Sequence, residues 1–121
     1  MTRKILAVDD SRTMRGILKK VLSGAGYAVD LAEDGEDGLD VLSRSVPDLV
    51  ITDINMPKLD GFGFIDQIRR QDALRAMPVL VLTTESAAEL KDRARSAGAT
   101  GWIVKPFEED KLLAAIRMVV A

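Results

Sequence analysis

The chain has 121 residues, 47% of them hydrophobic and 30% charged, which is the size and balance of a single soluble folded domain. Its formal charge of −2 provides no basic surface, so neither nucleic acid nor an anionic membrane is expected as a direct partner. The chain contains no cysteine and no histidine, which excludes disulfides, thiol nucleophiles and histidine-based triads or metal sites. Any chemistry must therefore use carboxylates, hydroxyls or lysine.

The first residues, Met1 to Lys4, lead directly into the apolar run Ile5 to Val8. This start contains no signal-peptide pattern, and no stretch of the sequence is long and apolar enough to cross a membrane. A cytoplasmic protein is therefore expected.

Short apolar runs rich in β-branched residues alternate with longer segments of helical period along the chain. This alternation predicts five βα units around a parallel sheet. The predicted strands cover Lys4–Val8, Ala28–Ala32, Leu49–Thr52, Val79–Thr83 and residues 102–104. Three of them are nearly all apolar, which indicates that helices cover both faces of the sheet.

The first predicted helix carries apolar residues on one face, from Met14 to Leu22, and stops at the glycines Gly24 and Gly26. Further helices are predicted at residues 36–43, 62–70, 87–97 and Glu109–Val119. The last of these reaches almost to the C-terminus. One domain spanning residues 1–121, with no output domain, is therefore expected.

Polar residues follow or close the predicted strands. In an open parallel sheet the binding site lies at the carboxyl ends of the strands. Asp9 and Asp10 follow the first strand, Asp53 the third and Lys105 the fifth, and Thr83 closes the fourth. Three carboxylates against one ammonium leave two negative charges uncompensated, which a divalent cation would neutralise. Mg²⁺ fits best, because it takes one or two carboxylates and leaves positions for waters and phosphate oxygens.

Each residue also has an ordinary structural interpretation. Asp9, Asp10 or Ser11 could cap the following helix, and Asp53 could open a turn towards Pro57. A threonine in a strand and a single lysine are common on any surface. Independent causes would rarely place all of these residue types at the ends of separate strands in one sheet, so the pattern favours a functional site.

Five motifs in order resemble the receiver domain of two-component response regulators, specifically the stand-alone CheY-like chemotaxis type. The resemblance spans essentially the whole chain. It is carried by Asp9–Asp10, the segment 52–57, Asp60–Gly61, the segment 83–85 and the segment 105–107. It implies a flavodoxin-like (βα)5 fold, in which a doubly wound parallel sheet has the strand order 2-1-3-4-5.

The resemblance also implies residue roles. Asp53 would be the phosphoacceptor, and Asp9, Asp10, Asp53 itself and the main-chain carbonyl of Asn55 would contact Mg²⁺. The phosphoryl contacts would be Thr83 and Lys105, with a cis peptide bond between Lys105 and Pro106.

The implied partners follow from the same resemblance. The phosphodonor would be a phosphohistidine on a sensor histidine kinase, since this chain has no histidine. The chain would be no enzyme beyond its own phosphorylation and autodephosphorylation. It would act as a monomer that binds the flagellar motor switch or another phosphorylation-dependent partner. A phosphate sink and a phosphorelay intermediate stay open as alternatives.

Trp102 departs from the chemotaxis pattern, which usually has a tyrosine three residues before the lysine. An indole is larger than a phenol and can only donate a hydrogen bond, so the coupling of this residue to the site is expected to differ. The expected switch and partner face comprises Lys91, Arg95, Trp102, Val104 and Lys111. Separately, Asn55 and Glu85 resemble the residue pair of fast-recycling chemotaxis receivers.

Two other classes share parts of the pattern. Phosphohydrolases of the haloacid dehalogenase type also use an aspartate nucleophile with Mg²⁺, but they place a second aspartate where this chain has Asn55. Flavodoxins share the fold. Their phosphate loop is rich in hydroxyls, however, whereas Asp9 and Asp10 would repel a flavin phosphate.

Overall fold

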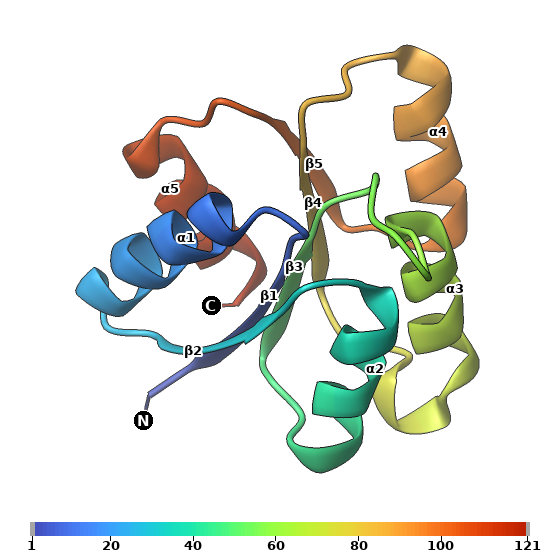
Figure 1. Cartoon of the computed structure of the whole chain (residues 1–121), viewed down its shortest axis with the longest axis horizontal. Helices are drawn as coiled ribbons and strands as arrows, with labels where there is room; N and C mark the ends of the chain where they lie inside the picture. The colour runs from blue at the N-terminus through green and yellow to red at the C-terminus, as the bar shows by residue number, and fades with distance from the viewer. Residues whose placement is uncertain (1, 121) are drawn as a thin grey trace.

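The structure is a computed structural model that describes residues 2–120. Over this range five strands alternate with five α-helices, as the sequence pattern predicts (Figure 1). In chain order the elements are β1 (Lys4–Val8), α1 (Arg12–Gly24), β2 (Ala28–Ala32), α2 (Gly35–Arg44), β3 (Leu49–Thr52), α3 (Gly61–Arg70), the 3₁₀ helix η1 (Asp72–Leu74), β4 (Val79–Thr83), α4 (Ala88–Ala97), β5 (Gly101–Val104) and α5 (Glu109–Val119).

Most predicted boundaries agree with the structure, and the differences have local causes. Helices α2 and α3 each begin one residue before the predicted start, at Gly35 and Gly61, because the side chains of Asp34 and Asp60 cap them. Helix α2 also ends one residue later than predicted, and α4 begins one residue later. Strand β5 begins at Gly101, one residue before the predicted start, because Gly101 pairs with Leu80 of β4. Glycine has a low strand propensity, so nothing in the sequence indicated this pairing. The short helix η1 was not predicted.

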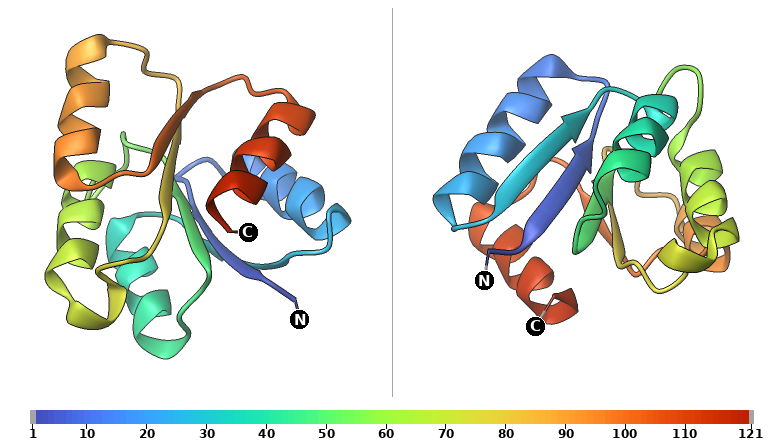
Figure 2. Two further views of the ribbon diagram at one scale, coloured as in Figure 1. Left: turned by 180° about the vertical axis from the view of Figure 1, so that it is seen from behind. Right: turned by 90° about the horizontal axis from the view of Figure 1, so that it is seen from below.

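The five strands form one parallel sheet in the order β2-β1-β3-β4-β5. Helices α1 and α5 cover one face of the sheet, and α2, α3 and α4 cover the other (Figures 1 and 2). This arrangement confirms the predicted flavodoxin-like fold and its strand order. Across the described residues, no helix is long and apolar enough to span a membrane.

Alternating side chains of the central strands lie in two separate hydrophobic cores, one on each face of the sheet. Leu6 and Val8 of β1 pack with the α2–α4 layer, while Ile5 and Ala7 pack with the α1 and α5 layer. Burial of one such leucine or isoleucine contributes about 2 kcal/mol, so both layers hold the sheet firmly. These two cores explain why the central strands read as continuous apolar runs.

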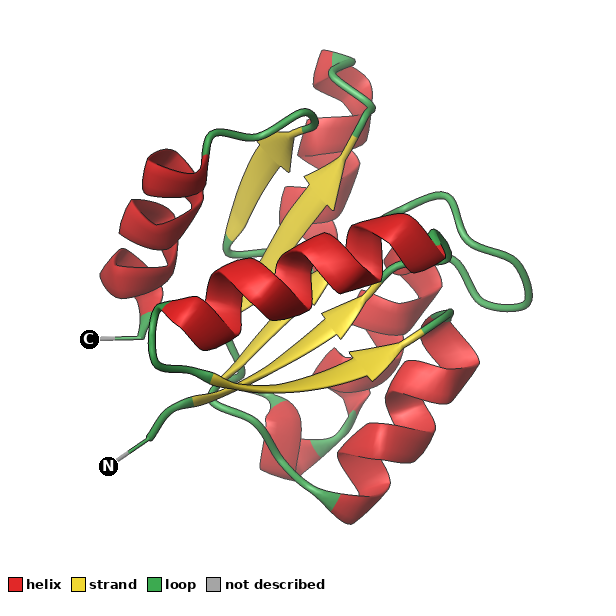
Figure 3. Ribbon diagram, turned by 60° about the vertical axis from the view of Figure 1, so that its left-hand side comes forward, coloured by secondary structure: helices red, strands yellow, loops and turns green. Residues whose placement is uncertain are grey.

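The register of the strands brings their carboxyl ends to a common edge. Val8 pairs with Thr52, and Thr83 pairs with Val104. The loops that follow β1, β3, β4 and β5 therefore leave the sheet side by side at this edge (Figure 3). The residues singled out from the sequence as cation and phosphoryl contacts all lie in or next to these loops.

Helix α4 is the least firmly packed of the five helices. Among its described residues only Ala94 is buried, and its N-cap residue Ala87 makes no side-chain cap hydrogen bond. The guanidinium of Arg93 lies 4.0 Å from the ring centroid of Phe62 in α3, a contact that ties the two helices together.

Candidate functional site

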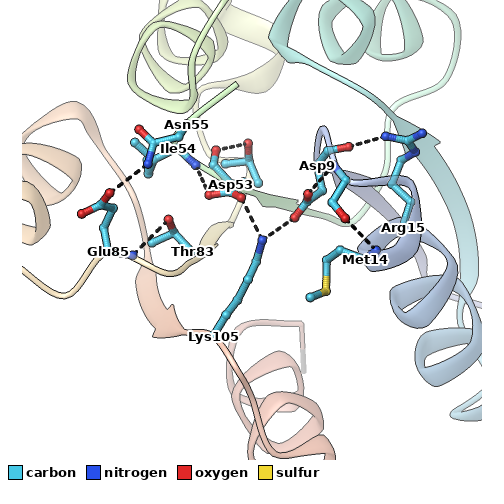
Figure 4. Close-up of polar contacts among 11 residues, drawn as sticks. Asp9, Met14, Arg15, Asp53, Ile54, Asn55, Thr83, Glu85 and Lys105 are labelled. Carbon is cyan, nitrogen blue, oxygen red and sulfur yellow. Dashed lines mark hydrogen bonds and ion pairs between the residues drawn. The ribbon is translucent and has the colours of Figure 1, made fainter. Parts of the chain in front are cut away.

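Three side chains from three strand ends meet at the centre of the site (Figure 4). The ammonium of Lys105 donates to Asp9 Oδ2 at 2.7 Å and to Asp53 Oδ2 at 2.8 Å. The parallel pairing of β1 with β3 continues past the strands, because the amide of Asp53 donates to the carbonyl of Val8 at 3.0 Å. The sheet therefore sets the separation of the two carboxylates, and Lys105 bridges them.

The carboxylate of Asp53 is oriented at both of its oxygens. Its Oδ1 accepts a hydrogen bond from the amide of Ile54 at 2.6 Å, while Oδ2 faces Lys105. Asp53 is 9% exposed and Asp9 only 1%. Asp53 is thus the more accessible of the two buried carboxylates.

Lys105 stays positively charged in this setting. Burial tends to lower its pKa, but the hydrogen bonds that it donates to Asp53 and Asp9, together with their negative charges, outweigh burial and raise the pKa above the ordinary lysine value. The peptide bond between Lys105 and Pro106 is cis, as the resemblance implied.

Ser11, and neither aspartate, caps α1. The Ser11 hydroxyl accepts from the amide of Met14 at 3.2 Å. Asp9 Oδ1 instead accepts from the amide of Ser11 at 2.9 Å, and Arg15 Nη1 donates to the carbonyl of Asp9 at 2.7 Å. Helix capping therefore does not explain Asp10, which is exposed. The contact of Arg15 had no signal in the sequence.

The carboxylates of Asp9, Asp10 and Asp53 each offer one oxygen within 4.8 Å of the others. Hard oxygen donors at this spacing, two of them buried, form a donor set that suits a divalent cation such as Mg²⁺. Within residues 2–120, Lys105 supplies the only ammonium paired with these carboxylates, so the charge balance also favours a bound cation.

Thr83 and Asn55 are linked through Glu85. Thr83 is fully buried at the end of β4, and its hydroxyl accepts from the amide of Glu85 at 3.4 Å. The Glu85 side chain accepts from Asn55 Nδ2 at 2.9 Å (Figure 4). The loop after β4 is therefore tied to the loop after β3 at the rim of the site.

Trp102 contacts the same loop from the side of β5. Its indole Nε1 donates to the main-chain oxygen of Glu85 at 3.0 Å. Beside the indole lies a pocket of about 280 Å³, lined by Lys91, Ala94, Arg95, Ala99, Thr100, Gly101 and Trp102. The two basic residues and the indole expected on the partner face therefore share one hollow.

The other two residues expected on that face lie outside this pocket. Val104 is exposed at the end of β5. Lys111 lies on α5, where its ammonium is 3.5 Å from the carboxylate of Glu108, and both side chains are well exposed. Such an exposed ion pair contributes little to stability.

The family model for the response regulator receiver domain matches residues 5–117 of the chain. Among solved structures, the chemotaxis response regulator CheY4 of Vibrio cholerae is 40% identical with a TM-score of 0.93, and the match covers 98% of this chain and 99% of that one. The receiver domain of the sensor histidine kinase PA1611 from Pseudomonas aeruginosa PAO1, which has a magnesium ion coordinated in its active site cleft, is 26% identical with a TM-score of 0.92, covering 99% of this chain and 98% of that one.

Curated relatives extend the comparison to longer proteins. Response regulator MprA of Mycobacterium leprae is 39% identical over 117 residues, which are 97% of this chain and 50% of that protein. A Porphyridium aerugineum protein described as “Probable transcriptional regulator ycf27” is 40% identical over 97% of this chain and 48% of its own length. The chain thus spans about half the length of these curated relatives. Its fold, its acidic site and these matches agree, and the chain belongs to the response regulator receiver domain family.

Proposed function

We propose that the chain is a phosphorylation-dependent switch of a two-component system, in which Asp53 accepts a phosphoryl group from a phosphohistidine of a sensor histidine kinase. The observation that carries this proposal is the Lys105 ammonium, which bridges the carboxylates of Asp9 and Asp53 at 2.7 and 2.8 Å. Asp10 adds a third carboxylate at the same edge of the sheet.

The accessibility and orientation of Asp53 suit a nucleophile. One of its carboxylate oxygens attacks the phosphorus atom of the donor, and a P–O bond forms as the P–N bond to the donor imidazole breaks. The imidazole nitrogen leaves with the electron pair and takes up a proton. Such a transfer depends mainly on in-line positioning and on neutralisation of charge on the phosphoryl oxygens.

The residues around Asp53 supply the remaining functions. Asp9, Asp10, Asp53 and the main-chain carbonyl of Asn55 would hold Mg²⁺, which when bound neutralises negative charge on the phosphoryl group. Lys105 places its own positive charge beside the phosphoryl oxygens. The hydroxyl of Thr83, at the end of β4, donates a hydrogen bond to one of them.

Labelling with a small phosphodonor tests this proposal. Acetyl phosphate with Mg²⁺ is expected to add one acid-stable, base-labile phosphoryl group, measured by intact mass, and chelation of Mg²⁺ should stop the reaction. Asp53→Ala should abolish labelling. Asp60→Asn is the matched control, because asparagine can still cap α3. Equal labelling of Asp53→Ala and wild type would show that Asp53 is not the phosphoacceptor.

The output face in this proposal is the pocket beside Trp102, which Lys91 and Arg95 also line. A pocket lined by an apolar indole and two cations suits an amphipathic partner segment with acidic residues. The full-length match to CheY4 of Vibrio cholerae, a chemotaxis response regulator, supports control of a flagellar motor switch as the biological role. Beryllofluoride with Mg²⁺ should increase retention of an acidic motor-switch peptide in a pull-down.

Control of transcription is a second candidate role, favoured by the similarity to the ycf27 protein of Porphyridium aerugineum. The same pull-down tests motor control against the phosphate-sink and relay roles. Beryllofluoride-dependent retention of the motor-switch peptide supports chemotaxis. Retention of the kinase alone would instead fit a phosphate sink or a relay, and would contradict motor control.

A further inference from the structure

We infer that Asp34 and Gly35, at the N-terminal end of α2, are positioning residues for the phosphoacceptor site. They act by fixing residues 54–60, hereafter the β3–α3 loop, which carries Asn55. The inference rests on the proposed function, because it concerns the same cation and phosphoacceptor site. It adds a role for a helix that contributes no side chain to that site.

The β3–α3 loop is closed tightly at its end. The amide of Gly61 donates to the carbonyl of Ile54 at 2.9 Å, and a Cβ atom on Gly61 would lie 2.3 Å from the carbonyl oxygen of Asp53. Between these ends, Lys58 has a φ of 66°, a left-handed conformation that non-glycine residues rarely adopt. The loop therefore needs support from its surroundings to hold one shape.

Helix α2 supplies that support through main-chain contact. The amide of Gly35 donates to the carbonyl of Leu59 at 3.0 Å. A Cβ atom at position 35 would lie 2.5 Å from that same oxygen and 2.9 Å from the Cβ of Leu59. Only a residue without a side chain lets α2 approach so closely, and the start of α2 lies beside the loop in Figures 1 and 2.

Asp34 prepares this contact. Asp34 as a whole is 2% exposed, and its Oδ1 accepts from the amide of Asp37 at 2.8 Å as the N-cap of α2. Its Oδ2 lies 4.0 Å from the ammonium of Lys58, the residue in the left-handed conformation. The Lys58 side chain is 60% exposed, so this attraction is weak, and the Gly35 contact is the stronger of the two restraints.

The restraint acts on one side of the site. Asp53 is held by the pairing of its amide with the carbonyl of Val8, by the amide of Ile54 and by the ammonium of Lys105, and none of these three hydrogen bonds involves a residue of α2. Asn55, whose carbonyl is the proposed cation contact, lies within the restrained loop. Weakening the contact of Gly35 with Leu59 should therefore reduce Mg²⁺ affinity more than it changes the position of Asp53. Residues that support a metal ligand typically change metal affinity by about 10- to 100-fold.

Two glycine-to-alanine variants in α2 provide a matched test. Gly35→Ala places a methyl group against the loop carbonyl, whereas the methyl group of Gly38→Ala meets the ring tip of Phe64, at 2.8 Å, in the core. For each variant we would measure the Mg²⁺ dissociation constant by calorimetry, the melting temperature, and hydrogen exchange of the residue 35 amide. Gly35→Ala should weaken Mg²⁺ binding by about tenfold or more and speed that exchange. Gly38→Ala should lower the melting temperature while its Mg²⁺ affinity stays within about twofold of wild type.

The inference would be overturned if both variants lost Mg²⁺ affinity in proportion to their loss of stability. It would also be overturned if Gly35→Ala folded and bound Mg²⁺ with unchanged affinity. If Gly35→Ala does not fold, Asp34→Ala takes its place with the same expected results, because it removes the N-cap of α2 and the Lys58 contact without adding bulk beside the loop. A wild-type protein that neither binds Mg²⁺ nor labels at Asp53 would instead refute the proposed function itself. The two failures are therefore distinguishable.

Discussion

The indole of Trp102 donates a hydrogen bond to the main-chain oxygen of Glu85 over 3.0 Å, and so joins β5 to the loop after β4. The amide of the same Glu85 donates to the hydroxyl of Thr83, the proposed phosphoryl contact. A movement of Thr83 towards a phosphoryl group would therefore displace the main chain of Glu85, whose carbonyl holds the indole. An indole has no acceptor, so this donor contact is its only strong hydrogen bond to the loop.

Trp102 fluorescence should report phosphorylation. Trp102 is the only tryptophan of the chain, and the polarity around its ring changes if the Glu85 contact is lost or shortened. Beryllofluoride with Mg²⁺ should shift the emission maximum, and Thr83→Ala should reduce the shift while Asp53 still labels. An emission spectrum that stays unchanged at full phosphorylation would show that the signal leaves through the loop backbone of residues 84–88 instead.

Asp10 and Ser11 should separate metal binding from helix capping. Asp10→Ala should weaken Mg²⁺ binding by more than about tenfold, because it removes one of three carboxylates, and should hardly change the unfolding free energy. Ser11→Ala should cost about 1 kcal/mol of stability, because it removes the cap of α1, with little effect on Mg²⁺ affinity. Calorimetry and urea denaturation measure the two quantities. An unchanged Mg²⁺ affinity in Asp10→Ala would remove Asp10 from the cation site.

Lys105 should matter for stability as well as for phosphoryl transfer. Lys105→Met leaves the buried carboxylates of Asp9 and Asp53 without their shared cation, which should cost about 3 kcal/mol in the absence of divalent ions. Added Mg²⁺ should stabilise this variant more than it stabilises wild type, because the cation then replaces the missing charge. Urea denaturation with and without Mg²⁺ measures both effects. Equal stabilisation of the two proteins would indicate that the cation and Lys105 do not share these carboxylates.

The phosphoryl group on Asp53 should be short-lived, lasting seconds to minutes. Asn55 is exposed and Glu85 half-buried, and their side chains are hydrogen-bonded to each other at the rim of the site. The path by which a hydrolytic water approaches Asp53 is therefore lined by polar side chains. Replacing both with larger apolar residues, Asn55→Met with Glu85→Leu, should lengthen the lifetime severalfold by blocking that path. Loss of label can be followed by intact mass after the phosphodonor is removed. A wild-type signal that survives many hours would contradict the fast-recycling interpretation.

Much of the fold was predictable because its signals are local. Apolar runs such as Leu49–Thr52 predict strands buried on both faces, and the glycines after Leu22 predict the end of α1. The placing of Asp9, Asp53 and Lys105 at one edge also followed, because parallel strands direct their carboxyl ends the same way. Their contact distances confirm that the three side chains meet there.

The tertiary structure decided which neighbours each of these residues has. Ser11 rather than an aspartate caps α1, because Asp9 is already engaged by Lys105 and by the amide of Ser11. The contact of Gly35 with Leu59, and that of Trp102 with Glu85, join segments far apart in the chain through main-chain oxygens, which carry no sequence signal. Periodicity and residue type thus determined the elements and the chemistry of their ends, whereas the packing of the helices on the sheet determined which of those groups are restrained, exposed or coupled.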